Sequence, residues 1–159
     1  MRTSRLTAGQ TYPARPIWLV DVAFLLDTNV VSELRKAAPN PHVLAWHESQ
    51  RHAEAYLSVL VVGEIRQGIE RVRPRDPGQA DALERWLARL VTTYRSRILA
   101  VTAAVAEEWG RLNALPQPLP VIDGLMAATA KVHQLVLVTR NVADVARSGI
   151  PVVDPFDAN

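Results

Sequence analysis

The sequence predicts an α/β fold in which helices cover both faces of a parallel β-sheet. Short apolar runs alternate with longer amphipathic stretches along the chain, as in repeated strand and helix units. The first run, residues 18–26, is nearly continuous in apolar side chains rather than alternating, which is typical of a strand buried on both faces. Capping residues and prolines separate the stretches where helices are expected to begin and end.

The individual elements follow from these signals in chain order. Apolar runs predict strands at residues 18–26, 55–60, 98–101, 136–138 and 151–153. Amphipathic stretches predict helices at residues 28–36, 41–51, 62–71, 77–95, 102–115, 123–133 and 142–147. Asp76 followed by Pro77 begins the fourth helix, and Thr102 begins the fifth, which Pro116 stops. The prolines within residues 116–120 make that stretch an extended connector.

Length and composition are those of one globular domain. The chain has 159 residues, of which 48% are hydrophobic and 21% are charged, so an intrinsically disordered chain is excluded. It contains no cysteine, which excludes a disulfide framework, a thiolate metal site and a cysteine nucleophile. Any metal ion must therefore be held by oxygen or imidazole ligands.

The formal charge of +2 is unevenly distributed. Arg2, Arg5 and Arg15 are the only charged residues before Asp21, and residues 21–159 hold 15 basic and 16 acidic side chains. We expect residues 1–16 to be a flexible arm or an extension arising from start-site choice, and residues 17–159 to be the folded domain. Because that domain is nearly neutral, bulk positive charge does not explain how it would bind nucleic acid.

Nothing in the sequence predicts a membrane segment. The longest apolar stretch, residues 17–26, contains Asp21 and is far shorter than the roughly 20 residues that a spanning helix needs. Residues 1–16 also lack the apolar region of a secretory signal. We therefore expect a soluble, cytoplasmic protein.

Acidic residues occur where predicted strands end. Asp27 closes the first strand, Glu64 lies where the second gives way to a helix, Asp123 begins an almost uncharged helix, and Asp144 follows the fourth strand. Each has a plain structural alternative: a helix cap for Asp27 and Asp123, an ion pair for Glu64, and a solvated first helical turn for Asp144. Because parallel strands end at one edge of a sheet, we nevertheless expect the four side chains to converge.

Converging carboxylates predict a metal site. Without matched cations they would repel one another and raise their pKa values, and a divalent cation removes that cost. Oxygen ligands select Mg²⁺ or Mn²⁺, and magnesium keeps several waters. Such a site suits phosphodiester hydrolysis, in which the metal orients a water, charge on phosphorus is stabilised, and a spare carboxylate takes a proton.

Five segments together resemble one enzyme family. They are residues 25–34 (LLDTNVVSEL), 62–68 (VGEIRQG), 122–130 (IDGLMAATA), 137–144 (LVTRNVAD) and 152–156 (VVDPF). In order and spacing they resemble the PIN-domain ribonucleases of the VapC toxin family, including its FitB-like branch. The resemblance implies a PIN-like three-layer α/β/α sandwich with a central five-stranded parallel sheet. It also implies a Mg²⁺- or Mn²⁺-dependent endoribonuclease toxin, a small cognate antitoxin of the VapB or FitA kind, and homodimerisation.

The resemblance also implies roles for individual residues. Asp27 and Asp123 would be the principal metal ligands, with Glu64 binding metal or positioning water. The family often places a fourth acid where this chain has Asn141, so either Asp144 supplies that carboxylate one helical turn later or the site works with three carboxylates. We expect the first of these.

The polar residues around these acids are expected to bind substrate. Asn141 would hydrogen-bond a water or a phosphate, Arg140 would contact phosphate, and Asn29 and Thr139 would complete the substrate-binding set. The run Arg66, Arg71, Arg73 and Arg75 is read as a solvated face that also offers a grip on RNA phosphates or on an acidic partner.

Two other enzyme and signalling classes fit the sequence less well. Phosphatases of the haloacid-dehalogenase type need a second Asp two positions after the first, where this chain has Asn29. A receiver domain needs an acidic pair before Asp27, where Leu25 and Leu26 stand. Two readings within the PIN family remain open: a nuclease that acts in RNA processing without an antitoxin, and a catalytically weak scaffold that acts as a binding module.

Overall fold

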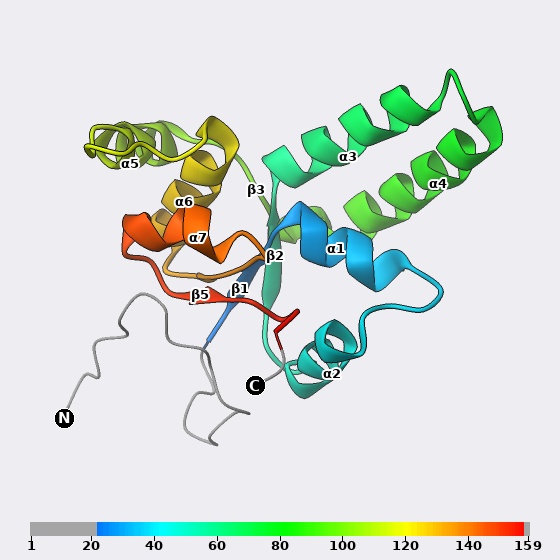
Figure 1. Ribbon diagram of the computed structural model, residues 1–159, viewed down its shortest axis with the longest axis horizontal. Coiled ribbons are helices and arrows are strands. Elements are labelled where there is room, and N and C mark those ends of the chain that lie inside the picture. Colours follow the sequence, from blue (N-terminus) through cyan, green and yellow to red (C-terminus); the bar gives the residue numbers. More distant parts are fainter. Residues whose placement is uncertain (1–21, 158–159) are drawn as a thin grey trace.

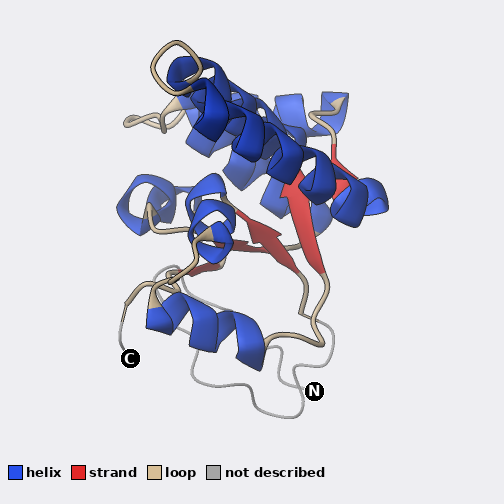
Figure 2. Cartoon of the chain, turned by 90° about the vertical axis from the view of Figure 1, so that its right-hand side faces the viewer, coloured by secondary structure: helices blue, strands red, loops and turns tan. Residues whose placement is uncertain are grey.

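A five-stranded parallel sheet forms the centre of the protein. The computed structural model describes residues 22–157. The strands are β1 Phe24–Leu26, β2 Ala55–Ser58, β3 Ile98–Leu99, β4 Val136–Val138 and β5 Val152–Val153. Their order across the sheet is β3-β2-β1-β4-β5, and every neighbouring pair is parallel. The predicted five-stranded parallel sheet is confirmed, and the strands lie among the surrounding helices in Figure 2.

Within the described part of the chain, seven helices cover the two faces of this sheet. They are α1 Thr28–Arg35, α2 Pro41–Ser49, α3 Val59–Val72, α4 Pro77–Tyr94, α5 Ala103–Asn113, α6 Val121–His133 and α7 Val142–Val145. Two 3₁₀ turns, η1 Arg95–Arg97 and η2 Ala146–Ser148, follow α4 and α7. Right-handed crossovers place α1 to α4 on one face and α5 to α7 on the other, as Figure 1 shows. The three-layer sandwich is therefore confirmed.

The strand order places a crevice beside β1. The chain runs outward from β1 through β2 to β3, and then returns to place β4 on the other side of β1. Connections leave the carboxyl ends of β1 and β4 toward opposite faces, and this divergence opens a crevice between the two strand ends. Asp27 directly follows β1 and Thr139 directly follows β4. The fold therefore brings two residues far apart in sequence to the place where α/β sheets bind ligands.

The core explains why the strands read as continuous apolar runs. Leu25, Leu57, Leu137 and Val138 are essentially inaccessible to solvent because helices cover both faces of the sheet. The inner face of α6 packs on the sheet through small side chains, among them Ala127. Within residues 22–157, no helix has the length and apolar content needed to cross a membrane.

Two helices begin earlier than the sequence predicts. The hydroxyl of Ser58 accepts a hydrogen bond from the Leu60 amide at 3.1 Å, so α3 begins at Val59, three residues before the predicted start at 62. Strand β2 accordingly ends at Ser58, two residues before the predicted end at 60. The helix predicted at residues 123–133 begins at Val121, with Pro120 at the N-cap position. Asp123 is therefore a first-turn residue, and the alternative that it caps the helix is wrong.

Other predicted boundaries agree with the structure more closely. The Asp76 carboxylate accepts from the Gln79 amide at 2.9 Å, and the Thr102 hydroxyl accepts from the Val105 amide at 3.3 Å, so both predicted caps are confirmed. The first strand begins at Phe24, and residues 18–21 of its predicted range lie outside the described residues. The predicted arm, residues 1–16, also lies outside them, and its separation from the domain stays a prediction.

Gly124 permits close packing between α5 and α6. A Cβ atom at this position would lie 3.1 Å from Cδ1 and 3.2 Å from Nε1 of Trp109. Gly124→Val should therefore lower the free energy of unfolding by about 1–3 kcal/mol, because the indole must move within a packed interface. Gly68→Val, where a new Cβ meets nothing within 4 Å, is the matched control and should change it by less than about 0.5 kcal/mol. Equal losses in urea unfolding would contradict this account.

Candidate active site

Asp27 is anchored at the junction of β1 and α1. Its backbone amide donates to the Val138 carbonyl of β4 at 2.9 Å, and its side chain accepts from the Thr28 amide at 2.7 Å. The second carboxylate oxygen accepts from the Thr139 hydroxyl at 2.7 Å. Asp27 is only 7% exposed and Thr139 is fully buried. Asp27 therefore caps α1, which was the structural alternative considered for it. The loop after β4 also fixes the orientation of its carboxylate.

Asn29 and Thr139 connect that loop to α1. The side-chain amide of Asn29 donates to Asp27 Oδ2 and to Thr139 Oγ1, both at 3.3 Å. Its carbonyl oxygen accepts from the Arg140 amide at 3.3 Å, and the Thr139 hydroxyl accepts from the Asn141 amide at 3.0 Å. This network fixes the backbone of three consecutive residues after β4 relative to Asp27.

A polar cavity collects most of the predicted site residues. It has a volume of about 490 Å³ and is lined by Asp27, Thr28, Asn29, Glu64, Ile122, Asp123, Arg140 and Asn141. Glu64 reaches it from α3 and Asp123 from the first turn of α6. Thr139 lies behind Asp27, to which it is hydrogen-bonded. Three carboxylates, one at the N-cap of α1, one within α3 and one in the first turn of α6, therefore share one cavity.

Asp144 occupies a different position from the other acids. It is an exposed residue in the first turn of α7 and is not among the residues that line the cavity, whereas Asn141 is. Its charge is nevertheless close enough to contribute to the raised pKa of Asp123. Its role as the fourth acid stays a prediction.

Among the described residues, none of the three carboxylates in the cavity takes part in an ion pair. Burial raises the pKa of Glu64, and the charges of Asp27 and Asp123 raise it further. Burial likewise raises the pKa of Asp123, with Asp27 and Asp144 adding to the effect. Burial is the larger cause of both shifts, and the remainder is repulsion between carboxylates, which a bound cation relieves.

The donor set fits a hard divalent cation that keeps part of its water shell. Within residues 22–157, no three His, Asp or Glu side chains lie close enough together to form a preassembled ligand cage. Mg²⁺ is commonly bound through one or two carboxylates, with waters filling its other positions. The oxygen ligands available are the carboxylates of Asp27, Glu64 and Asp123, and their uncompensated charge agrees with such a cation.

The arginines near Glu64 pair with other acids. Arg66 lies 2.8 Å from Glu84 and 3.3 Å from Glu70, and Arg73 contacts both of these acids and Asp81. None of the ion pairs among the described residues includes Glu64. The alternative that Glu64 forms an ion pair with a neighbouring arginine is therefore wrong. Arg66 and Arg73 instead hold α3 against α4.

Comparison with known proteins identifies the family. Residues 24–145 match the PIN domain family. This chain belongs to it. The PIN domain is 31% identical over 137 residues to toxin FitB of Neisseria gonorrhoeae, covering 83% of this chain and 97% of that protein. It is 32% identical over 138 residues to the plasmid stability protein StbB of Pseudomonas syringae pv. tomato, covering 84% of this chain and 99% of that protein.

Two further relatives agree with this assignment. The PIN domain is 29% identical over 137 residues to VapC ribonuclease Y4jK of Sinorhizobium fredii, covering 84% of this chain and 97% of that protein. The crystal structure of FitAcB from Neisseria gonorrhoeae superposes with a TM-score of 0.76 at 29% identity, covering 85% of this chain and 99% of that chain. The predicted likeness to VapC and FitB proteins is confirmed.

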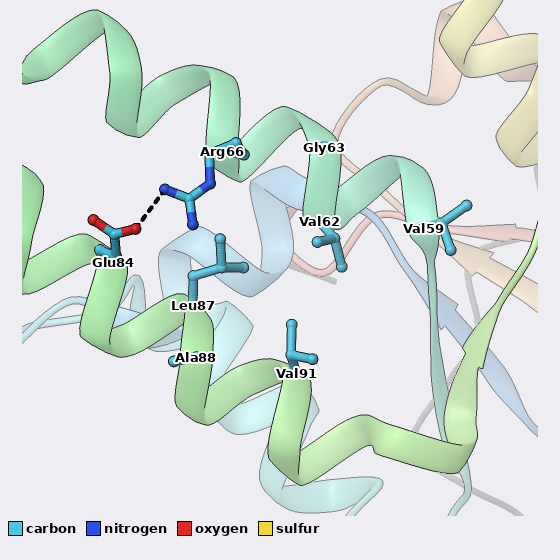
Figure 3. Close-up of a pocket in the computed structure, with 8 residues that line it drawn as sticks. All are labelled: Val59, Val62, Gly63, Arg66, Glu84, Leu87, Ala88 and Val91. Carbon is cyan, nitrogen blue, oxygen red and sulfur yellow. Dashed lines mark hydrogen bonds and ion pairs between the residues drawn. The ribbon is translucent and has the colours of Figure 1, made fainter.

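A second, mainly apolar groove lies between α3 and α4 of this PIN domain. These two helices form a hairpin that projects beyond the sheet (Figure 1), and a cavity of about 690 Å³ separates them at the sheet end. Figure 3 shows its lining residues: Val59, Val62, Gly63, Arg66, Glu84, Leu87, Ala88 and Val91. We call this the α3/α4 groove. Val59 and Val91 are 40% and 37% exposed, so the groove presents apolar surface to solvent.

Sequence reasoning missed several features of the PIN-domain site. The Thr28 hydroxyl is buried and makes no hydrogen bond of good geometry within the described residues, yet it lies near enough to Glu64 to lower the pKa of that carboxyl. Ile122 lines the cavity wall. The ring of Phe156 lies beneath the guanidinium of Arg140, with 3.8 Å between the guanidinium carbon and the ring centre. The only signal for Phe156 was its place in the last of the five resembling segments, since an aromatic residue alone suggests core packing.

Proposed function

We propose that this PIN domain is the toxin of a type II toxin–antitoxin module and that it acts as a metal-dependent endoribonuclease. The observation that carries this proposal is the meeting of Asp27, Glu64 and Asp123 in one polar cavity at the carboxyl edge of the sheet. The names of the relatives support it, since one is a VapC ribonuclease and another is a toxin. The reaction would be hydrolysis of an RNA phosphodiester that leaves a 5′-phosphate.

Asp27 and Asp123 would be the principal ligands of the metal ion, with Glu64 binding the metal or positioning its water, and we expect the ion to be Mg²⁺, with Mn²⁺ as a substitute. When bound, the metal supplies an activated water and stabilises charge on the phosphodiester in the transition state. Thr139 and Asn29 hold the Asp27 carboxylate in one orientation through their hydrogen bonds. This fixed orientation avoids reorganisation of the site during the reaction.

Glu64 is suited to accept a proton during hydrolysis. In the metal-free protein burial and neighbouring acids raise its pKa, and a carboxylate that positions the attacking water can take the proton that this water loses. We expect Asp144, at the exposed rim, to assist as the fourth acid. On the substrate side, Arg140 and Asn141 line the cavity and would donate hydrogen bonds to RNA phosphate oxygens.

The function is tested with purified protein freed of any antitoxin. With Mg²⁺ or Mn²⁺ it should cut single-stranded or looped cellular RNAs to products with 5′-phosphates, and expression in a host should arrest growth. Folded protein that leaves every RNA intact would contradict the endoribonuclease proposal and favour a catalytically weak scaffold that acts as a binding module. Cleavage without growth arrest, and without a small antitoxin gene beside it, would favour an RNA-processing nuclease.

We also propose that the antitoxin covers both the acidic cavity and the α3/α4 groove. Helix α3 joins the two surfaces, because Val62 and Gly63 line the groove and Glu64 lines the cavity. A peptide with an apolar helical face and a basic residue would fit both surfaces. Its apolar face would bury surface area in the groove, and its cation would offset the charge of the carboxylates in the cavity. Such a partner would block access of RNA to the metal ligands.

Charge in the groove should weaken that complex. Val91→Asp should reduce the affinity for the co-expressed FitA-like antitoxin by about tenfold, because the carboxylate is desolvated against an apolar helix face. Val132→Asp on α6 is the matched control, since Val91 and Val132 are both 37% exposed. Isothermal titration with both variants measures the difference. Unchanged affinity for Val91→Asp would place the antitoxin elsewhere.

Homodimerisation and a cytoplasmic location stay predictions of the same proposal. A dimer is the form implied by the family resemblance, and light scattering at micromolar concentration tests it. Monomeric protein at that concentration would contradict it. The location follows from the proposed substrate, because cellular RNA and a co-expressed antitoxin are both cytoplasmic.

A further inference from the structure

The guanidinium of Arg140 stacks on an aromatic ring and does not pair with the nearby acids. It lines a cavity that contains Asp27, Glu64 and Asp123, yet none of the ion pairs among the described residues includes it. Its guanidinium carbon instead lies 3.8 Å from the centre of the Phe156 ring. A guanidinium stacked on an aromatic face is attracted by the ring and is less free to turn toward an acid.

The sheet itself brings these two residues together. The Thr139 amide donates to the Val153 carbonyl at 3.0 Å, so β4 and β5 remain paired up to their carboxyl ends. Arg140 follows directly after Thr139, and Phe156 follows three residues after Val153. The Asp154 carboxylate accepts from the Phe156 amide at 2.9 Å and thereby turns the chain back under Arg140.

Arg140 is also held at its backbone. Its amide donates to the Asn29 side chain at 3.3 Å, so the main chain and the guanidinium are fixed by separate contacts. The charge of Arg140 also acts on Glu33, but the Glu33 carboxylate already accepts hydrogen bonds from Lys36 and from the Asn40 amide. Those two bonds lower the pKa of Glu33 most, and the charge of Arg140 adds to the effect.

We infer that Phe156 is a positioning residue, which keeps the Arg140 guanidinium off the cavity carboxylates and presents it to an RNA phosphate. This inference rests on the proposed function and deepens it. The ring occupies one face of the guanidinium, so the N–H groups at its edge remain free to donate to a phosphate. The cavity carboxylates therefore remain available to a cation. The Arg140 guanidinium, already held in place, binds the phosphate.

The stack is tested first by NMR on the full chain with ¹⁵N-labelled arginine. The Nε–H signal of Arg140, assigned by its loss in Arg140→Gln, should show a ring-current shift that disappears in Phe156→Leu. Phe156→Trp keeps an aromatic face and should retain such a shift. Identical Arg140 signals in wild-type protein and Phe156→Leu would overturn the inference.

The effect on phosphate is measured with uridine 5′-monophosphate, which requires no cleavage. Phe156→Leu should weaken its binding about two- to fivefold, the size expected for loss of an exposed cation–π contact, and Phe156→Trp should restore it. In an Arg140→Gln background, Phe156→Leu should cause no further loss, because its target is gone. In RNA cleavage, Phe156→Leu should raise KM by the same factor with kcat unchanged.

The outcomes separate this inference from the proposed function. An equal loss of phosphate binding from Phe156→Leu with and without Arg140 would show a general structural effect and overturn the inference. Wild-type protein that binds no uridine 5′-monophosphate would overturn it as well. Protein that binds the nucleotide through Arg140 and Phe156 but cuts no RNA would contradict the proposed endoribonuclease and leave the positioning role of Phe156 standing.

Discussion

Replacing Asp27 with Asn should lower the rate of RNA cleavage by about a thousandfold or more. The carboxylate is buried, is oriented by Thr139 and Asn29, and shares its cavity with Glu64 and Asp123. An amide lacks the charge that holds a divalent cation, and it presents an N–H where an oxygen is needed. Single-turnover cleavage of a labelled RNA at saturating Mg²⁺ measures the loss.

The same variant should not unfold the protein. Because Asp27 raises the pKa of both Glu64 and Asp123 through repulsion, its removal should leave the metal-free melting temperature equal to or above that of the wild type. Glu107→Gln, on the exposed surface of α5, is the matched control and should keep full activity. Asp144→Asn, at the exposed rim of the site, should lower the rate because we expect Asp144 to be the fourth acid. Its full activity would remove Asp144 from the catalytic set, and a fully active Asp27→Asn would refute the metal-ligand assignment itself.

Divalent metal should control both activity and stability. Chelation should abolish cleavage, and Mn²⁺ at a hundred times its Kd should raise the melting temperature by roughly 5–10 °C near neutral pH. The physical reason is that the metal offsets the repulsion within the acidic cavity. Asp123→Asn should lose most of this shift, whereas Glu107→Gln, on the exposed surface of α5, should keep it. An equal shift in all three proteins would place the metal elsewhere.

The pH dependence of the metal-free protein follows from the same charges. Burial and neighbouring acids raise the folded-state pKa values of Glu64 and Asp123 above those of the unfolded chain. Their contribution to stability is therefore present below the ordinary carboxylate range and is lost as pH rises through the raised values. Asp123→Asn should be more stable than the wild type above that window, with the difference vanishing below it. A constant difference across pH would contradict this.

The sheet was predictable from the sequence because its physical cause is local. Runs such as residues 136–138 are apolar without alternation, which requires a strand covered on both faces, and that strand is β4. Helix starts were less predictable. Ser58 lies inside an apolar run that resembles a strand, and only its hydrogen bond to the Leu60 amide shows that the helix has already begun.

Some features of the candidate site were also predictable from the sequence, and others were not. Convergence of Asp27, Glu64 and Asp123 follows from a general rule about the carboxyl edge of parallel sheets, so it was predictable from their positions. The hydrogen bond from Thr139 to Asp27 and the stack of Arg140 on Phe156 depend on which strands become neighbours. The α3/α4 groove depends on how two helices diverge, which their separate amphipathic patterns do not encode.

The hydrogen bond between Asp27 and Thr139 joins residues 112 positions apart, and β1 and β4 are neighbours in the sheet. During synthesis the carboxylate emerges first, and the hydroxyl that orients it emerges 112 residues later. An interrupted polypeptide that lacks β4 therefore has no oriented Asp27. The order of synthesis therefore delays assembly of the acidic cavity until β4 has been made, so a polypeptide shortened before β4 should cleave no RNA.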